Sequence, residues 1–145
     1  MSNRRERFER ASIAPSVQIQ YIDPKVAREL PLIFGFKNMD LDKKPFDCSE
    51  GDGKGMLYIL KTLTHFSNTS RSIIDINFKN CHPVPEEDIR KHNLTNFVKL
   101  SSSGKLHQLG RKQTPQRIVG YYEDFPKINQ FQICLLDLQH KLSGD

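Results

Sequence analysis

Residues 117–138 read RIVGYYEDFPKINQFQICLLDL, and this stretch decides the fold class. Its two halves, Arg117 to Tyr122 and Phe131 to Leu138, are rich in β-branched, aromatic and aliphatic residues, which favours two strands. The intervening segment from Asp124 to Asn129 contains Pro and Asn, which are typical of turns. A connection this short joins antiparallel neighbours. We therefore expect a hairpin at the centre of an antiparallel sheet.

Outward from this hairpin, the chain alternates between strand and helix patterns. Met56, Leu57, Ile59, Leu60, Leu63 and Phe66 recur at steps of three and four residues, the period of an amphipathic helix. Shorter helices are expected at 23–30, where Pro24 follows Asp23, and at 86–92, where acids occupy the first turn. Further strands are expected at 17–22, 32–36, 72–78, 95–100 and 105–109, and a long surface loop at 37–55.

These elements predict an α+β fold. We expect an antiparallel sheet of about four to six strands packed against two or three helices that form a single layer. The chain has 145 residues, which suits one core. We expect a flexible, charged arm over residues 1–12 and a single α+β domain over residues 13–145.

Several classes of protein do not fit this sequence. The longest apolar runs are far shorter than the roughly 20 residues of a membrane span, and no apolar stretch follows the N-terminal arginines as in a signal peptide. The three cysteines are widely spaced and form no CxxC pair, so we expect a cytoplasmic protein without a zinc site, other metal or cofactor. Gly53-Lys54 is followed by Gly55 rather than by Ser or Thr, which excludes a Walker-type phosphate loop.

The positive charge is concentrated in the C-terminal part of the chain. Residues 1–88 carry 13 basic and 13 acidic side chains, whereas residues 89–145 carry 9 basic and 4 acidic ones, and this excess gives the net charge of +5. Such an asymmetry attracts phosphates and acidic proteins alike. A basic face that only aids solubility is the alternative interpretation.

Period-two alternation suggests which basic and aromatic side chains share a face. Lys105 and His107 lie on one face of their strand, and Arg117 and Tyr121 lie on one face of the next. Hairpin pairing would place these two pairs side by side. Arg111 and Lys112 would lie in the connecting loop, and His140 and Lys141 would follow the last strand.

This set contains the groups that metal-free RNA cleavage requires. His107 or His140 would exchange protons near neutral pH, Arg111 and Arg117 would neutralise a phosphate, and Tyr121 would stack on a base. We therefore take His107, Arg117, Tyr121 and His140 as candidate catalytic residues. Lys105, Arg111, Lys112 and Lys141 are candidate RNA-binding residues. The alternative is that these charges line the solvent-exposed face of an ordinary sheet.

The C-terminal third of the chain also resembles RelE/HigB-like toxins. The resemblance rests on Gly104-Lys105-Leu106-His107, on Arg117-Ile118-Val119-Gly120-Tyr121, on Phe131-Gln132-Ile133, and on Asp137 with His140-Lys141. In that superfamily a small sheet bearing basic, tyrosine and histidine residues cleaves mRNA, commonly on the ribosome, and an antitoxin neutralises it. The resemblance thus implies RNA, the ribosome and an antitoxin protein as partners.

The leading functional prediction is a toxin-like, metal-independent endoribonuclease. Two alternatives remain open, because the sequence leaves catalysis itself unsettled. The first is a non-enzymatic nucleic-acid-binding module that uses the same sheet. The second is a protein-interaction factor, such as an inhibitor or a phage-related accessory protein, whose partner is acidic.

Overall fold

The computed structural model describes residues 23, 26, 28–46, 53–77, 79–124 and 129–142. The arm predicted at 1–12 and the strand predicted at 17–22 lie outside the described residues, as does most of the helix predicted at 23–30. The elements, in chain order, are β1 (Ile33–Gly35), α3 (Gly53–Phe66), α4 (Arg71–Asn77), β2 (His82–Pro83), α5 (Glu86–Lys91), α6 (Thr95–Leu100), β3 (His107–Leu109), β4 (Arg117–Glu123) and β5 (Gln130–Asp137).

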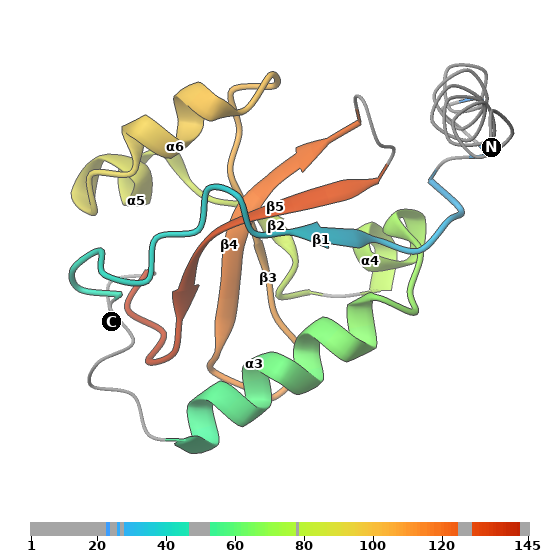
Figure 1. Cartoon of the computed structure of the whole chain (residues 1–145), viewed down its shortest axis with the longest axis horizontal. Coiled ribbons are helices and arrows are strands. Elements are labelled where there is room, and N and C mark those ends of the chain that lie inside the picture. Colours follow the sequence, from blue (N-terminus) through green and yellow to red (C-terminus); the bar gives the residue numbers. More distant parts are fainter. Residues whose placement is uncertain are drawn as a thin grey trace, which may run out of the picture.

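The sheet has five strands in the order β1-β5-β4-β3-β2 (Figure 1). The β2–β3, β3–β4 and β4–β5 pairs are antiparallel, which confirms the predicted hairpin and the mainly antiparallel sheet. The pair of β1 with β5 is parallel, so the sheet is mixed. The α+β prediction is therefore confirmed, with one parallel pair that short-range turn signals do not predict.

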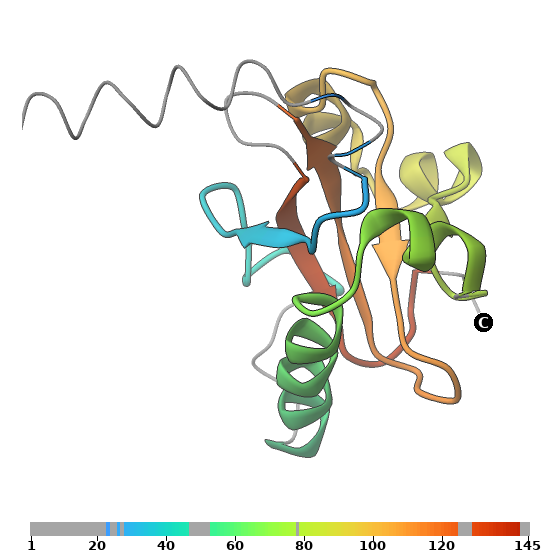
Figure 2. The ribbon, with the colours of Figure 1, turned by 90° about the vertical axis from the view of Figure 1, so that its right-hand side faces the viewer.

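Helices cover both faces of the sheet, so the predicted single layer of helices is wrong. On one face, Ile59 and Phe66 of α3 and Ile74 of α4 pack with Ile118 and Ile133 of the central strands. On the other face, Val119, Tyr121 and Leu135 are among the residues that pack against α5 and α6. Figure 1 shows α3 and α4 on one side of the sheet and α5 and α6 on the other, and Figure 2 shows α3 and α4 in front of the strands. Because β4 and β5 are apolar on both faces, each face needs its own cover.

Two segments that were predicted to be strands are helices. Residues 72–78 were expected to place Ile74 and Ile76 on one face, but α4 buries Ile74 completely and leaves Ile76 80% exposed. Residues 95–100 form α6, in which Phe97 and Val98 follow the buried Leu94 at helical spacing and pack on the same apolar cluster. In both segments tertiary packing overrides the β propensity of Ile, Val and Phe.

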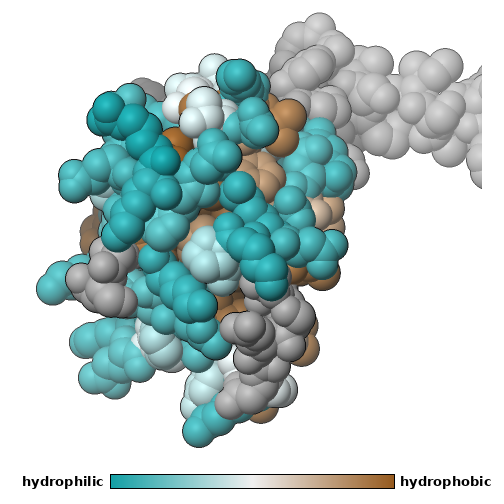
Figure 3. Space-filling model, turned by 90° about the vertical axis from the view of Figure 1, so that its left-hand side faces the viewer, coloured by the Kyte–Doolittle hydropathy of each residue, from teal (hydrophilic) through white to brown (hydrophobic). Residues whose placement is uncertain are grey.

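Apart from β2, which the sequence did not predict, the other elements agree with the sequence to within a few residues. α3 begins at Gly53, inside the loop predicted at 37–55, and buries Ile59 and Phe66 as its period predicts. α5 has acids in its first turn and Arg90 and Lys91 in its last, which suits the helix dipole. The face that carries α5 and α6 is largely hydrophilic on its outside (Figure 3). No helix in the described part of the chain combines the length and the apolar character that crossing a membrane demands.

Candidate functional site

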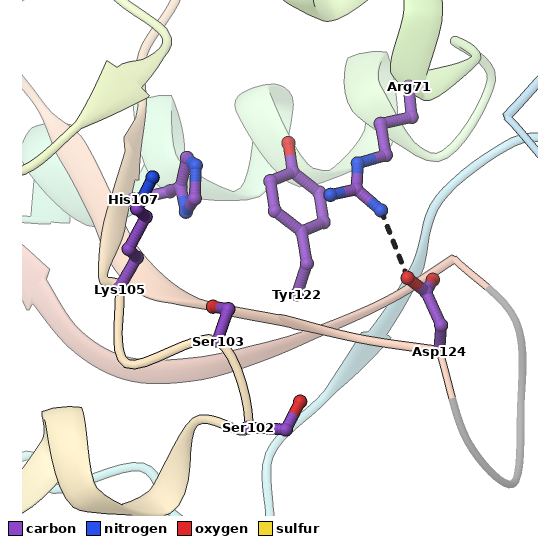
Figure 4. A pocket seen from close by; sticks show the side chains of 7 residues that line it. All are labelled: Arg71, Ser102, Ser103, Lys105, His107, Tyr122 and Asp124. Carbon is purple, nitrogen blue, oxygen red and sulfur yellow. Dashed lines mark hydrogen bonds and ion pairs between the residues drawn. The ribbon is translucent and has the colours of Figure 1, made fainter.

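A pocket of about 400 Å³ opens between the start of α4, the loop before β3, and the strands β3 and β4. Its walls combine cationic, hydroxyl and aromatic groups with one carboxylate (Figure 4). The lining residues are Arg71, Ser102, Ser103, Lys105, His107, Tyr122 and Asp124. The pocket therefore joins the start of α4 to the antiparallel strands β3 and β4, which follow it in the chain.

The pairing of β3 with β4 decides which side chains meet at this pocket. His107 lies opposite Gly120, and Leu109 lies opposite Ile118. Tyr122 is two residues beyond Gly120 and so shares the face of His107. The rings of His107 and Tyr122 make an edge contact, with centroids 4.9 Å apart. Gly120 has no side chain, and a Cβ there would overlap the carbonyl oxygen of Gln132 and the ring of Phe131.

Arg71 forms the second wall of the pocket. Its guanidinium carbon lies 3.9 Å from the centroid of the Tyr122 ring, which is a cation–π contact. Its terminal nitrogen donates to Asp124 Oδ2 at 3.3 Å, and the Arg71 side chain is 16% exposed. Arg71 Nε is buried and has no hydrogen-bond partner among the described residues. The guanidinium thus lies against the ring of Tyr122, and its Nε–H is a buried donor without a partner among the described residues.

The pocket keeps His107 neutral. Burial, together with the nearby positive charges of Arg71 and Lys105, lowers the pKa of His107 to about 4. Nδ1 of His107 is buried without a hydrogen-bond partner among the described residues. A neutral imidazole is in the protonation state that a general base requires, and the negative charge of a bound phosphate would raise its low pKa.

Tyr122 also stays uncharged in this environment. Burial and, to a lesser extent, the charge of Asp75 raise the pKa of its phenol above the ordinary value. Its ring is covered by Arg71 and contacts His107 and Phe131 edge-on, with centroids 5.1 Å apart for the Phe131 pair. Because the ring is already packed in this way, Tyr122 shapes the pocket and offers no free face for stacking on a base.

Of the candidate residues, the structure brings only Lys105 and His107 together. Arg117 and Tyr121 share a face of β4, as predicted, but it is the opposite face from His107, so the predicted cluster of the four residues is wrong. Arg117 is buried and donates to the carbonyl oxygens of Thr114 and Gln116. Burial lowers the pKa of the Arg117 guanidinium, and Asp137 opposes this effect.

Tyr121 is likewise unavailable for stacking on a base. It is 2% exposed, and its hydroxyl accepts a hydrogen bond of 2.8 Å from Asn38 Nδ2. Burial raises the pKa of its phenol. Tyr121 therefore has the environment of a core residue.

The remaining candidates lie toward the opposite end of the hairpin. Arg111 Nε donates to Thr62 Oγ1 at 3.0 Å and so ties the β3–β4 loop to α3, and Lys112 in that loop is exposed. His140 and Lys141 follow Asp137, which pairs with Arg117 at the far end of β4. Asp137 caps this turn by accepting hydrogen bonds from the backbone amides of Lys141 and Leu142. None of these basic residues lines the pocket of His107.

Five pocket residues were missed from the sequence: Arg71, Ser102, Ser103, Tyr122 and Asp124. Arg71 carries no signal in the sequence, because its position depends on how α4 packs. Tyr122 does carry one. Leu109 shares the face of His107, so pairing that apolar residue with the core residue Ile118 places Tyr122, rather than Tyr121, beside the histidine.

Metal and thiol chemistry have little basis in the part of the chain that the structure describes. No group of three or more His, Cys, Asp or Glu side chains there is placed to hold a metal ion. Burial raises the pKa of Cys81 to about 11 and that of Cys134 to about 12, so neither thiol is activated as a nucleophile.

Comparison with known proteins yields no relative. No protein-family model matches the chain, and neither a curated protein nor a solved structure matches it. The function of the protein is therefore inferred from the pocket itself.

Proposed function

We propose that the protein is a metal-independent endoribonuclease whose active site is the pocket around His107. The observation that supports this proposal is the convergence of Arg71, Lys105 and a neutral His107 on one cavity. A buried nitrogen without a partner costs about 1–3 kcal/mol, and this pocket contains two, on His107 and Arg71. An anionic ligand that accepts from Arg71 would offset part of that cost.

The pocket residues divide the chemistry of RNA cleavage among them. The imidazole of His107 removes the proton of the 2′-hydroxyl, and the resulting oxygen attacks the adjacent phosphorus. Arg71 and Lys105 stabilise the negative charge that develops on the phosphate oxygens. The bond from phosphorus to the 5′-oxygen then breaks, and the ammonium of Lys105 protonates that oxygen. The products are a 2′,3′-cyclic phosphate and a free 5′-hydroxyl, and proton exchange with water restores both side chains.

We assign the acid to Lys105 rather than to Tyr122 for a physical reason. Lys105 is exposed and carries a mobile ammonium group. Burial makes the phenol of Tyr122 a weaker acid than usual. A weaker acid transfers its proton less readily to the leaving oxygen.

The test is cleavage of labelled RNA in EDTA by the native protein and by His107→Asn. We expect His107→Asn to lose about 100-fold or more of the rate, the usual contribution of a general base. His140→Asn is the matched control, because His140 lies outside the pocket and asparagine tolerates its positive φ of 55°. Unchanged cleavage by His107→Asn, or products without a cyclic phosphate, would overturn the proposed mechanism.

Binding without cleavage would instead favour the non-enzymatic nucleic-acid-binding module. The same cations support that alternative, since Arg71 and Lys105 would hold a phosphate without any proton transfer. In that case RNA affinity would fall steeply with salt and with Arg71→Gln, and it would not respond to His107→Asn. Absence of both cleavage and RNA affinity would favour the protein-interaction factor.

A further inference from the structure

Among the described residues that line the pocket, Asp124 is the one carboxylate. Its Oδ2 accepts from Arg71 at 3.3 Å, and its Oδ1 accepts from the backbone amide of Asn129 at 3.2 Å. The Asp124 side chain is 59% exposed, and ion pairs as exposed as this add little to folding stability. The main effect of Asp124 is on the pocket, where its negative charge offsets half of the positive charge of Arg71 and Lys105.

The charges around the pocket are unequal. Arg71 and Lys105 contribute two positive charges and Asp124 contributes one negative charge. His107 is neutral at pH 7, because burial lowers its pKa to about 4. Asp75 also acts on Tyr122, but it is exposed on α4 and does not line the pocket. The described residues of the lining therefore carry one net positive charge at neutral pH.

A site with one net charge discriminates between the two kinds of phosphate in RNA. An internal phosphodiester carries one negative charge, whereas a terminal phosphate monoester carries nearly two at neutral pH. The attraction to the site grows in proportion to the ligand's charge. The cost of removing the ligand from water grows with the square of that charge, so the doubly charged group loses more than it gains.

We propose that Asp124 determines specificity, making the pocket select the singly charged phosphodiester of an internal RNA linkage over a doubly charged terminal phosphate. This inference rests on the proposed function, because a phosphate has to bind beside Arg71 and Lys105. It accounts for an acidic side chain in a pocket that is otherwise built for an anion.

The experiment compares two ligands that differ by one charge. They are 2′-deoxyuridine 3′-phosphate and the methyl ester of the same phosphate. Neither ligand has a 2′-hydroxyl, so neither can be cleaved. Their affinities are measured by NMR titration at low salt and about pH 8, where the monoester is fully a dianion. The proteins are the wild type, Asp124→Asn and Glu123→Gln. Asparagine keeps an oxygen that can accept from the Asn129 amide, so this hydrogen bond is retained.

We expect the wild type to bind the ester at least as tightly as the dianion. Asp124→Asn should improve binding of the dianion about fivefold more than binding of the ester, because one more ligand charge interacts with the removed carboxylate. Glu123→Gln removes the same charge from the adjacent residue, whose side chain pairs with Lys37 and lies outside the pocket. It should leave the ratio of the two affinities unchanged.

The outcomes separate this inference from the proposed function. The role of Asp124 is overturned if the wild type binds the dianion more tightly than the ester. It is also overturned if the ratio of the two affinities is the same in Asp124→Asn as in the wild type. The phosphate site then still stands if Arg71→Gln weakens binding of the ester. If neither ligand binds the wild-type protein, the phosphate site and the inference built on it both fail.

Discussion

Protonation of His107 links the pocket to the stability of the whole protein. In the unfolded chain its pKa returns to 6.5, whereas in the folded protein burial and the nearby cations lower it to about 4. Between these values the unfolded state binds a proton that the folded state does not, so the free energy of unfolding falls as the pH falls. The stability is complete above pH 6.5 and is lost progressively as the pH approaches 4.

The magnitude follows from the same two pKa values. Lowering the pKa from 6.5 to about 4 corresponds to roughly 3 kcal/mol if nothing screens the imidazole. His107 is only half-buried at the pocket wall, and water screens part of this effect. We therefore expect His107 to account for about 1.5 kcal/mol of acid destabilisation.

The assay is urea unfolding, followed by circular dichroism at several values between about pH 4 and pH 7.5, of the wild type and His107→Asn. Comparing the two proteins cancels the titration of all other groups. The wild type should lose about 1.5 kcal/mol more than the variant over this interval. A difference between the two proteins that stays constant with pH would refute the buried, cation-flanked environment assigned to His107.

Two further predictions concern the sheet that supports the pocket. Gly120→Ala should destabilise the protein by about 3 kcal/mol or more in urea unfolding, because the new Cβ would overlap the Gln132 carbonyl oxygen. Gly53→Ala is the control and should not lower the free energy of unfolding, because the space around Gly53 is open. Equal stabilities of the two variants would contradict the tight packing at Gly120. Asp137→Asn should lower the free energy of unfolding by about 1–2 kcal/mol. The two carboxylate oxygens accept from the backbone N–H groups of Lys141 and Leu142, and the amide nitrogen of asparagine cannot replace one of them. An unchanged urea midpoint would show that this cap is dispensable.

The parts of the fold that the sequence predicts well are those in which one period dominates. The apolar positions of α3 recur at helical steps, and the helix buries Ile59 and Phe66 accordingly. β4 and β5 are runs of apolar residues joined by a short turn, and they pair as an antiparallel hairpin. Local patterning and tertiary packing agree in these elements.

The errors fall where few side chains are buried. α4 has a single buried side chain, Ile74, among its described residues. The β-branched residues around Ile74 therefore led to the wrong prediction of a strand. α6 packs through Phe97 and Val98, and its helical spacing becomes visible only when Leu94, which precedes it, is included. The parallel pairing of β1 with β5 joins residues almost a hundred positions apart, which no local signal encodes.

The candidate site shows the same division between local and long-range information. Lys105 and His107 are neighbours in the chain, and alternation places them together correctly. Their partners depend on the register of β3 against β4, and the loop between these strands does not fix it. Arg71 and Asp124 reach the pocket only through the packing of α4 against β4.

The two walls of the pocket belong to parts of the protein that differ in how firmly they are held. Tyr122 stands on β4 at the centre of the sheet, where β4 and β5 are buried on both faces, and His107 stands on β3, which pairs with β4. Arg71 stands on α4, a short helix with Ile74 as its buried anchor and with Ile76 facing solvent. Backbone amides of α4 should therefore exchange with deuterium through local opening, whereas those of β4 and β5 should exchange only through global unfolding. The cation–π wall can then detach and return while the wall bearing the histidine stays in place.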